Sequence, residues 1–412
     1  MSTDRTGHVG QGRDGAIAVA QSRRAAVAAG QPDYLILGLV VGLVVLGLLM
    51  VYSSSFALGL QAFGDANYFV ARQAGFAVLG LGLMLILMRI DYMWLRSISP
   101  LLMLVAIVAL VAVLVPGLGV TRYGAQRWIE VGPVPPLQPS EFAKLALIIY
   151  VSAWLSSKGD DVQSFALGFV PFVMMVGVVA GLVLLEPDTG TAAVIVLVTV
   201  TLFFIAGASL THLAALVGIG GVAAFMLILT ASYRADRIFA FVKAEDDPAG
   251  VGFHTLQMLI ALGSGGITGL GLGASRQKFF YIPGSHTDGI FAVVGEELGF
   301  IGLMGVMILF GVLIYRGFRV VLGARDQFGS LLATGIVCWI AYQALINVGG
   351  VTRTIPLTGI PMPFLSYGGS ALASLLAAIG ILLSISRRSA NPAGVEKPER
   401  KPARATAQRG VR

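Results

Sequence analysis

The hydrophobic residues of this chain occur in long uninterrupted runs, and its polar residues gather in the segments between them. A helix that crosses a lipid bilayer needs about 20 mostly apolar residues. The strands of a membrane β-barrel would be about ten residues long and would alternate polar with apolar positions, a pattern that is weak here. We therefore predict a bundle of ten transmembrane helices, near residues 34–53, 68–89, 98–116, 141–156, 164–185, 190–207, 211–231, 289–315, 328–349 and 367–386.

The composition agrees with a membrane-embedded chain. Hydrophobic residues make up 56% of its 412 residues and charged residues only 12%, whereas a soluble domain has about 25% charged residues. The predicted fold class is an all-α integral membrane protein. Its first 30 residues are polar and show no short apolar core with a cleavage site after it, so we expect the first helix to be its own signal anchor.

The net charge of +7 is concentrated in residues 387–412, so it is a property of the tail and does not indicate a nucleic-acid partner. We expect disordered cytoplasmic tails at residues 1–32 and 389–412, and a membrane domain at residues 33–388. The basic C-terminal tail is expected to lie against an anionic inner leaflet. The only cysteine, Cys338, excludes a disulfide within the chain and a cysteine metal cluster.

Ten helices would place both termini on one side of the membrane, and most Lys and Arg residues then lie on that side, which predicts cytoplasmic termini. The two long loops, residues 117–140 and 232–288, are therefore expected outside the cytoplasm. The second, between the seventh and eighth helices, contains a short apolar helix and a glycine-rich stretch over residues 253–273. Tight backbone packing explains these glycines better than a phosphate-binding loop, since no strand and no GK[ST] accompany them.

Glu141 and Lys144 begin the fourth predicted helix and share one face, three residues apart, with Ser140 as the expected N-cap. They form either a helix-start ion pair or a phosphate-binding cation held by its carboxylate. Arg122 and Arg127 lie upstream beside Trp128, at the expected outer interface. Arginines there contact either an anionic headgroup or diphosphate, or only solvent.

Glu186 and Asp188 occupy a tight turn between the fifth and sixth predicted helices, at the outer edge of the bundle. Helix capping by Asp188 is the simpler interpretation of this turn, which Pro187 enforces.

Asp288, Glu296 and Glu297 stand at the start of the eighth predicted helix. Asp288 is either an N-cap or a carboxylate at the outer rim that water and substrate can reach. The two glutamates point in different directions deeper in the membrane, where an ionised group costs about 2.5 to 3.5 kcal/mol. We expect structural burial, with one glutamate paired to Arg353 or Lys144.

Three regions resemble the signatures of the SEDS family (shape, elongation, division and sporulation), which includes FtsW and RodA. They are "AQRWIEVG…LQPSEFAKLA", "GLGLGASRQKFFYIPGSHTDGIFAVVGEELGFIG" and "TGIPMPFLSYGGSALASLLAAIGILLSISRR". The resemblance covers about residues 34–388. It implies a ten-helix bacterial plasma-membrane protein that polymerises lipid II into glycan strands with a class B penicillin-binding protein. The "HTDGIFAVVGEELG" stretch and the tails favour FtsW, with other divisome proteins as partners at the septum, whereas "GAQRW" also suits RodA.

The resemblance also implies roles for single residues. Asp288 matches the family's catalytic aspartate, Glu141 and Lys144 its "PSE..K" pair, and Arg127 its "RWI" arginine. A substrate-binding role is also expected for Arg122 at the outer interface, and for these residues near the aspartate or in the "SYGGS" loop: His286, Thr287, Ser366, Gly368 and Gly369. The chain departs from the family at Gly284, where a Glu is usual, and at Ala371, where a second Ser is usual.

These residues suggest a mechanism with one base and two cations. A diphosphate leaves as a stable anion, so Asp288 as base and Arg127 with Lys144 as charge-offsetting cations suffice. A divalent cation, Mg²⁺ or Mn²⁺, would suit these oxygen donors, but no ligand spacing identifies a site. The competing hypotheses are a lipid II flippase, an elongation-type polymerase and a non-catalytic divisome scaffold; no internal repeat supports a transporter.

Overall fold

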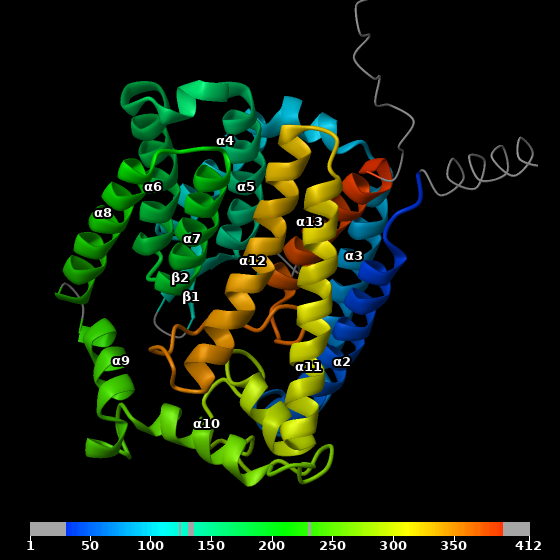
Figure 1. Ribbon diagram of the computed structural model, residues 1–412. Coiled ribbons are helices and arrows are strands. Elements are labelled where there is room, and N and C mark those ends of the chain that lie inside the picture. Colours follow the sequence, from blue (N-terminus) through cyan, green and yellow to red (C-terminus); the bar gives the residue numbers. More distant parts are fainter. Residues whose placement is uncertain (1–29, 123–124, 131–135, 230–231, 390–412) are drawn as a thin grey trace, which may run out of the picture.

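The computed structural model describes residues 30–122, 125–130, 136–229 and 232–389 (Figure 1). The predicted tails lie almost wholly outside these described residues. The elements in chain order are α2 (Tyr34–Phe63), α3 (Tyr68–Arg89), α4 (Tyr92–Leu114), β1 (Gly119–Arg122), β2 (Ala125–Ile129), α5 (Pro139–Lys158), η1 (Gly159–Gln163), η2 (Phe165–Phe169), α6 (Val170–Leu185), α7 (Thr189–Ile205), α8 (Leu210–Leu229), α9 (Ser232–Val242), η3 (Ala244–Asp246), α10 (Phe253–Ser264), α11 (Ile290–Gly323), α12 (Gln327–Val351) and α13 (Gly369–Ser389).

Each of the ten predicted hydrophobic runs contains a helix, and eight described helices are long and apolar enough to cross a membrane. The two that fall outside this group are α5 and α7, which correspond to the short fourth and sixth runs. Several predicted boundaries were wrong: α4 begins at Tyr92, where Asp91 caps it by accepting from Met93 N at 2.9 Å. The long helices α2 and α11 also extend past their predicted ends, to Phe63 and Gly323.

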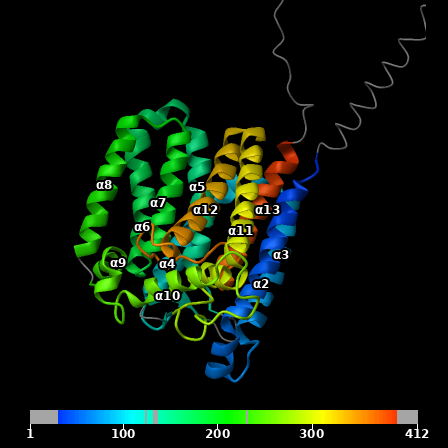
Figure 2. The ribbon, with the colours of Figure 1, turned by 60° about the horizontal axis from the view of Figure 1, so that its bottom comes forward.

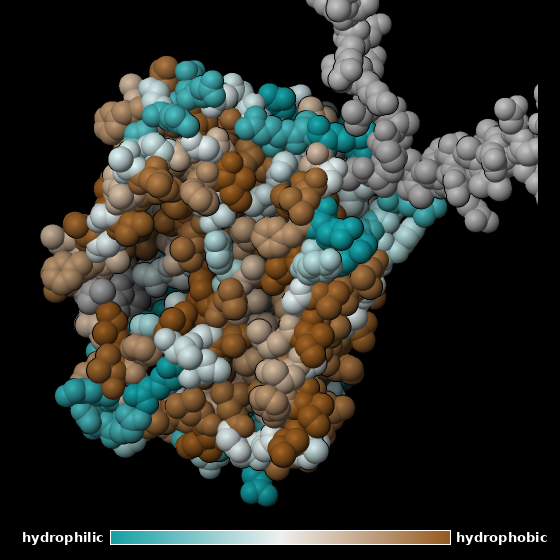
Figure 3. All heavy atoms as spheres, viewed as in Figure 1, coloured by the Kyte–Doolittle hydropathy of each residue, from teal (hydrophilic) through white to brown (hydrophobic). Residues whose placement is uncertain are grey.

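The helices differ greatly in how much of them is enclosed. Within the apolar window, 94% of α13 and 72% of α12 is buried, whereas none of α8 is. The views in Figures 1 and 2 agree, with α12 and α13 inside the bundle and α8 at its edge. Hydrophobic side chains cover much of the middle of the face in Figure 3, and hydrophilic ones gather toward the two ends. This distribution is typical of a protein that crosses a lipid bilayer.

Polar contacts close the end of the bundle where α2 begins and α13 ends. Asp33 accepts from the Arg316 guanidinium at 2.6 Å, and Asp33 N donates to Ser386 Oγ at 3.1 Å. Arg388 pairs with Asp91 at the same end. The hairpin lies at the lower ends of α6 and α7 in Figure 1, and α9 and α10 lie at the bottom of that view, away from this end.

The all-helical prediction missed a small β-hairpin in the loop at 117–140. Strands β1 and β2 pair antiparallel, with Gly119 opposite Ile129. The Gln126 amide donates to Val113 O at 2.9 Å and so fastens the hairpin to the end of α4. Strands of four and five residues are too short for an alternating pattern to reveal them. Helix α9 in the second long loop was also not predicted, whereas α10 confirms the expected short apolar helix.

Candidate active site

The segment that joins α12 to α13, residues 352–368, is the centre of the candidate site; we call it the connecting segment. Prolines and Gly359, whose φ is +75°, keep it from forming a helix. Its backbone oxygens accept side-chain donors from two helices: Thr358 O from Arg237 at 2.9 Å, Ile360 O from Asn347 at 2.8 Å, and Pro361 O from Gln343 at 3.0 Å. The connecting segment therefore links α9 and α12 at one place.

Asp288 lies against the connecting segment at the start of α11. Its backbone oxygen accepts from Asn347 Nδ2 at 2.9 Å, and its Oδ1 accepts from Thr287 Oγ1 at 3.0 Å. Asp288 is not the N-cap, since Gly289 occupies that position without a side-chain bond. The carboxylate, on a half-buried residue, is thus not used for capping.

Gly284 explains how the chain accommodates this aspartate. Its φ is +68°, and a Cβ at this position would lie 2.6 Å from Asp288 Oδ1 and 2.7 Å from Thr287 Oγ1. A larger residue would therefore push against the carboxylate in this conformation. Gly284, where the resemblance led us to expect Glu, thus lies directly beside the Asp288 carboxylate.

His286 and Ser366 fix the backbone around Asp288. Ser366 Oγ donates to Thr287 O at 2.6 Å and accepts from Met362 N at 2.8 Å, and Tyr367 N donates to His286 O at 2.8 Å. The His286 ring is enclosed by the Phe69 and Tyr367 rings. Burial lowers the pKa of His286 to about 4, so the imidazole is neutral at pH 7.

The two glycines of the "SYGGS" motif join the connecting segment to α3. Gly368 N donates to Gln73 Oε1 at 3.1 Å. A Cβ at Gly369 would lie 2.1 Å from the Phe76 ring, so only glycine allows this approach. These contacts favour positioning over direct contact with a ligand.

Glu141 and Lys144 form a buried ion pair on α5. Lys144 Nζ lies 2.8 Å from Glu141 Oε2, and each side chain is 3% exposed. The ammonium also approaches Gln343 Oε1 at 3.5 Å and lies over the Trp339 ring. Because Gln343 donates to Pro361 O, the pair is connected to the connecting segment. The expected N-cap at Ser140 was wrong: α5 starts at Pro139, after Gln138.

Arg127 binds the turn between α6 and α7. Its Nε donates to Glu186 O at 3.0 Å, a further nitrogen donates to Pro187 O, and its Nη1 lies 3.8 Å from Asp188 Oδ2. Its side chain is 24% exposed. Asp188 accepts from Thr191 N at 3.0 Å, which confirms its capping role. For Arg122, the side chain lies outside the described residues.

The turn also reaches the connecting segment. A Cβ at Gly190 would lie 2.5 Å from Ile360 Cγ1 and 3.2 Å from Thr358 O, so the first turn of α7 packs directly on that backbone. Gln343 and Asn347 are one helical turn apart on α12, about 6 Å. Through these contacts Arg127, Lys144 and Asp288 gather around the same few residues.

Glu186 is an acid without a hydrogen-bond partner for its carboxyl oxygens in the part of the chain that the structure describes. It is fully buried. Burial, helped by the negative charge of Asp188, raises the pKa of Glu186 to about 8, against the opposing effect of Arg127. The carboxyl group is therefore mostly protonated at pH 7.

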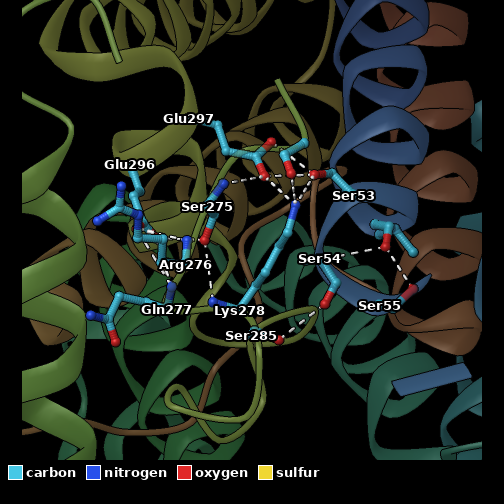
Figure 4. A network of polar contacts seen from close by, with 12 residues as sticks. Ser53, Ser54, Ser55, Ser275, Arg276, Gln277, Lys278, Ser285, Glu296 and Glu297 are labelled. Atoms are coloured by element: carbon cyan, nitrogen blue, oxygen red, sulfur yellow. Dashed lines mark hydrogen bonds and ion pairs between the residues drawn. The ribbon is translucent and has the colours of Figure 1, made fainter. Parts of the chain in front are cut away.

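Glu296 and Glu297 hold the long loop against the bundle, and Figure 4 shows Lys278 reaching between Ser53 and Glu297. Glu297 accepts from Lys278 Nζ at 2.8 Å and from Ser53 Oγ at 2.6 Å. Glu296 accepts from Ser275 Oγ and from Arg276 N, the latter at 2.9 Å. Structural burial is confirmed.

The predicted partners of these glutamates were wrong. Arg353 pairs with Glu245 and Lys144 with Glu141, while Lys278 pairs with Glu297. Lys278 was overlooked because it belongs to the loop, which folds back onto α11.

The glycine-rich stretch docks onto a break in α11. At Gly299 the backbone is non-helical, with φ 68° and ψ −169°. The backbone oxygen of Glu296 accepts from Leu270 N at 2.9 Å, and the backbone oxygen of Glu297 accepts from Gly271 N at 3.0 Å. A Cβ at Gly269 would lie 2.2 Å from Glu297 O, so the expected tight backbone packing is confirmed.

The described residues contain no group of three or more His, Cys, Asp or Glu side chains placed to hold a metal ion. The site residues that sequence reasoning missed are Arg237, Gln343, Asn347 and Gly359. Gln343 and Asn347 carried a usable signal, since two amides four residues apart in an apolar helix face the same direction.

The fold and these contacts define a multi-pass helical membrane protein with a polar site at one end of its bundle. A family model described as "Cell cycle protein", and named for FtsW, RodA and SpoVE, matches residues 33–391. The chain therefore belongs to the SEDS family.

Individual relatives agree with this assignment. The chain is 45% identical to stage V sporulation protein E of Bacillus subtilis, over 87% of this chain and 98% of that protein. It is 43% identical to a probable peptidoglycan glycosyltransferase FtsW of Trichlorobacter lovleyi, over 86% of this chain and 93% of that protein. Among solved structures, a chain of a peptidoglycan synthase complex gives a TM-score of 0.71 at 27% identity, over 87% of this chain and 98% of that one. The rod shape determining protein RodA of Thermus thermophilus gives a TM-score of 0.64 at 27% identity, over 86% of this chain and 97% of that one.

Proposed function

We propose that this chain is a peptidoglycan glycosyltransferase that polymerises lipid II into β-1,4 glycan strands. The observation that carries the proposal is the gathering of Asp288, Arg127 and Lys144 around one connecting segment. The names of its relatives, several of which are called probable peptidoglycan glycosyltransferase, support the same reaction.

In the proposed reaction the C4 hydroxyl of one sugar attacks the anomeric carbon of another. The new C–O bond forms as the bond from that carbon to the lipid diphosphate breaks, and the electron pair leaves with the diphosphate. The Asp288 carboxylate receives the hydroxyl proton. Attack opposite the leaving group inverts the anomeric carbon, from an α-linked donor to a β-linked product.

The two cations have different parts in this proposal. Arg127 is partly exposed, so its guanidinium can contact the departing diphosphate. Lys144 is buried in its ion pair, so it acts through its field and through Gln343 on the connecting segment. His286, Thr287, Ser366, Gly368 and Gly369 hold the backbone that presents Asp288.

We further propose ten membrane crossings with both termini in the cytoplasm, in which α5 and α7 supply the two crossings beyond the eight apolar spans. The hairpin, α9 and α10 then face the outside, where lipid II is polymerised. A class B penicillin-binding protein is the proposed transpeptidase partner. The high identity to FtsW relatives favours a septal role with the divisome over a role in elongation.

A vesicle experiment separates this enzyme from a lipid II flippase. Purified chain with its transpeptidase partner is placed in vesicles with fluorescent lipid II, and both glycan length and lipid movement are measured. Long glycan that disappears in Asp288→Asn supports the enzyme. Lipid movement without polymer would overturn the proposal in favour of transport.

A further inference from the structure

Arg237, on α9, faces Asp288 across Gly359. A Cβ at Gly359 would lie 3.6 Å from Arg237 Nη2 and 3.8 Å from Asp288 Oδ2, the only two atoms within 4 Å apart from those of its chain neighbours among the described residues. Arg237 Nη2 and Asp288 Oδ2 are thus at most 7.4 Å apart, because the distances of 3.6 Å and 3.8 Å are measured from the same Cβ position. Gly359 therefore leaves a space between a cation and the proposed base.

We propose that this space binds the reacting end of the substrate, with Arg237 on the diphosphate and Asp288 on the sugar hydroxyl. The inference rests on the proposed function and adds a residue to it. A hydroxyl bonds a carboxylate at about 2.7 Å and a phosphate oxygen bonds a guanidinium at about 2.8 Å. Arg237 Nη2 and Asp288 Oδ2 are close enough, within 7.4 Å of one another, for one bound substrate to bond to both.

The position of Arg237 is fixed by a hydrogen bond of its guanidinium and by contacts that hold the end of its helix. Arg237 Nη1 donates to Thr358 O at 2.9 Å, which orients Nη2 toward Gly359. The end of α9 is held by Arg353, which donates to Phe241 O at 2.8 Å and pairs with Glu245. A guanidinium anchored in this way loses little conformational entropy when it binds an anion.

His254, on α10, is an independent sign that a polar ligand enters this region. Its Nε2 is buried and has no hydrogen-bond partner within the described ranges. Burial lowers the pKa of His254, while Asp288 raises it and Arg237 lowers it further, so both charges act on the ring. A buried nitrogen without a partner is rare in a folded protein unless a ligand or water satisfies it.

Polymerisation kinetics with inorganic pyrophosphate as competitor test this assignment. We expect Arg237→Gln to lower kcat/KM at least about tenfold and to weaken inhibition by pyrophosphate by a similar factor. Arg237→Lys should recover part of both. Lys243→Gln, which removes a charge from an exposed side chain just after α9, is the matched control and should match the wild type.

Asp288→Asn separates this inference from the proposed function. It should abolish polymerisation yet keep pyrophosphate binding, measured as a shift in melting temperature, because Asp288 contacts the sugar hydroxyl and not the anion. If Arg237→Gln does not fold, Gly359→Asn replaces it, since Asn tolerates positive φ and would fill the space. Wild-type rates and wild-type pyrophosphate inhibition in either folded variant would overturn the inference and leave the proposed function intact. A wild-type protein that forms no polymer would overturn the proposed function itself.

Discussion

At the scale of single residues, the site depends on which polar groups have partners. Lys144 and Lys278 are each enclosed with one glutamate, and removing one member of such a pair leaves a buried charge uncompensated. Glu186 is handled differently, since it is buried without a partner for its carboxyl group in the described part of the chain. Its environment therefore favours the neutral form.

Glu186 gives stability a pH dependence with a definite sign. Its pKa rises from 4.5 to about 8 on folding, so the folded chain binds more protons than the unfolded chain between these values. Its contribution to the free energy of unfolding is complete below pH 4.5 and is lost as the pH rises through 8. The loss amounts to about 5 kcal/mol at most. Glu186→Gln cannot ionise, so we expect it to melt near the wild-type temperature at pH 5 and above it at pH 9.

Melting temperatures of both proteins from pH 5 to pH 9 check this expectation. His286 titrates with the opposite sign below pH 6.5 but contributes equally to both proteins, so the difference isolates Glu186. Parallel curves across the range would contradict the assigned environment.

Residue identity alone predicted some of these roles and not others. Asp288, Arg127 and Lys144 stand in long motifs and could be selected from the sequence. The partner of Glu297 could not, because Lys278 reaches it only after a loop folds back onto a helix, and sequence distance carries no sign of that. Arg237 likewise could not be selected from the sequence, because only the folded chain places it beside Gly359.

At the scale of elements, the break in α11 is the feature that brings the long loop to the bundle. The break at Gly299 interrupts the helical hydrogen bonds of α11, and backbone groups beside it bond to the glycine-rich stretch instead. The Glu296 side chain, just before the break, accepts from the backbone of the loop that follows this stretch. Gly269 makes the close approach possible.

Two neighbouring glycines test this packing against a common background. Both have positive φ, 80° at Gly269 and 103° at Gly271, so alanine strains the backbone at either one. A Cβ at Gly269 would also lie 2.2 Å from Glu297 O, whereas none of the surrounding atoms lies within 4 Å at Gly271. We expect Gly269→Ala to be less stable than Gly271→Ala by about 1–3 kcal/mol.

Unfolding free energies of the two variants in detergent measure this difference. Equal losses would mean that backbone strain alone matters here and that the loop does not pack on α11 as described.

At the scale of the whole molecule, the hydrophobic runs predicted the helical bundle because a spanning helix needs about 20 mostly apolar residues. The hairpin and α9 escaped prediction, since short elements between the apolar helices carry no such requirement. The gathering of α5, α7, α9, α11 and α12 around the connecting segment is a tertiary property. It arises from backbone oxygens that no residue pattern reveals.

The central claim is that the Asp288 carboxylate removes the proton from the attacking hydroxyl. The single-turnover rate of glycosyl transfer, measured with substrate bound before mixing, tests it most directly because binding and product release are removed from the rate. A general base contributes about 10²- to 10⁴-fold. We predict that Asp288→Asn, with an unchanged melting temperature and intact pyrophosphate binding, transfers at least about 100-fold more slowly than the wild type. A folded Asp288→Asn protein that transfers at the wild-type rate would contradict the account.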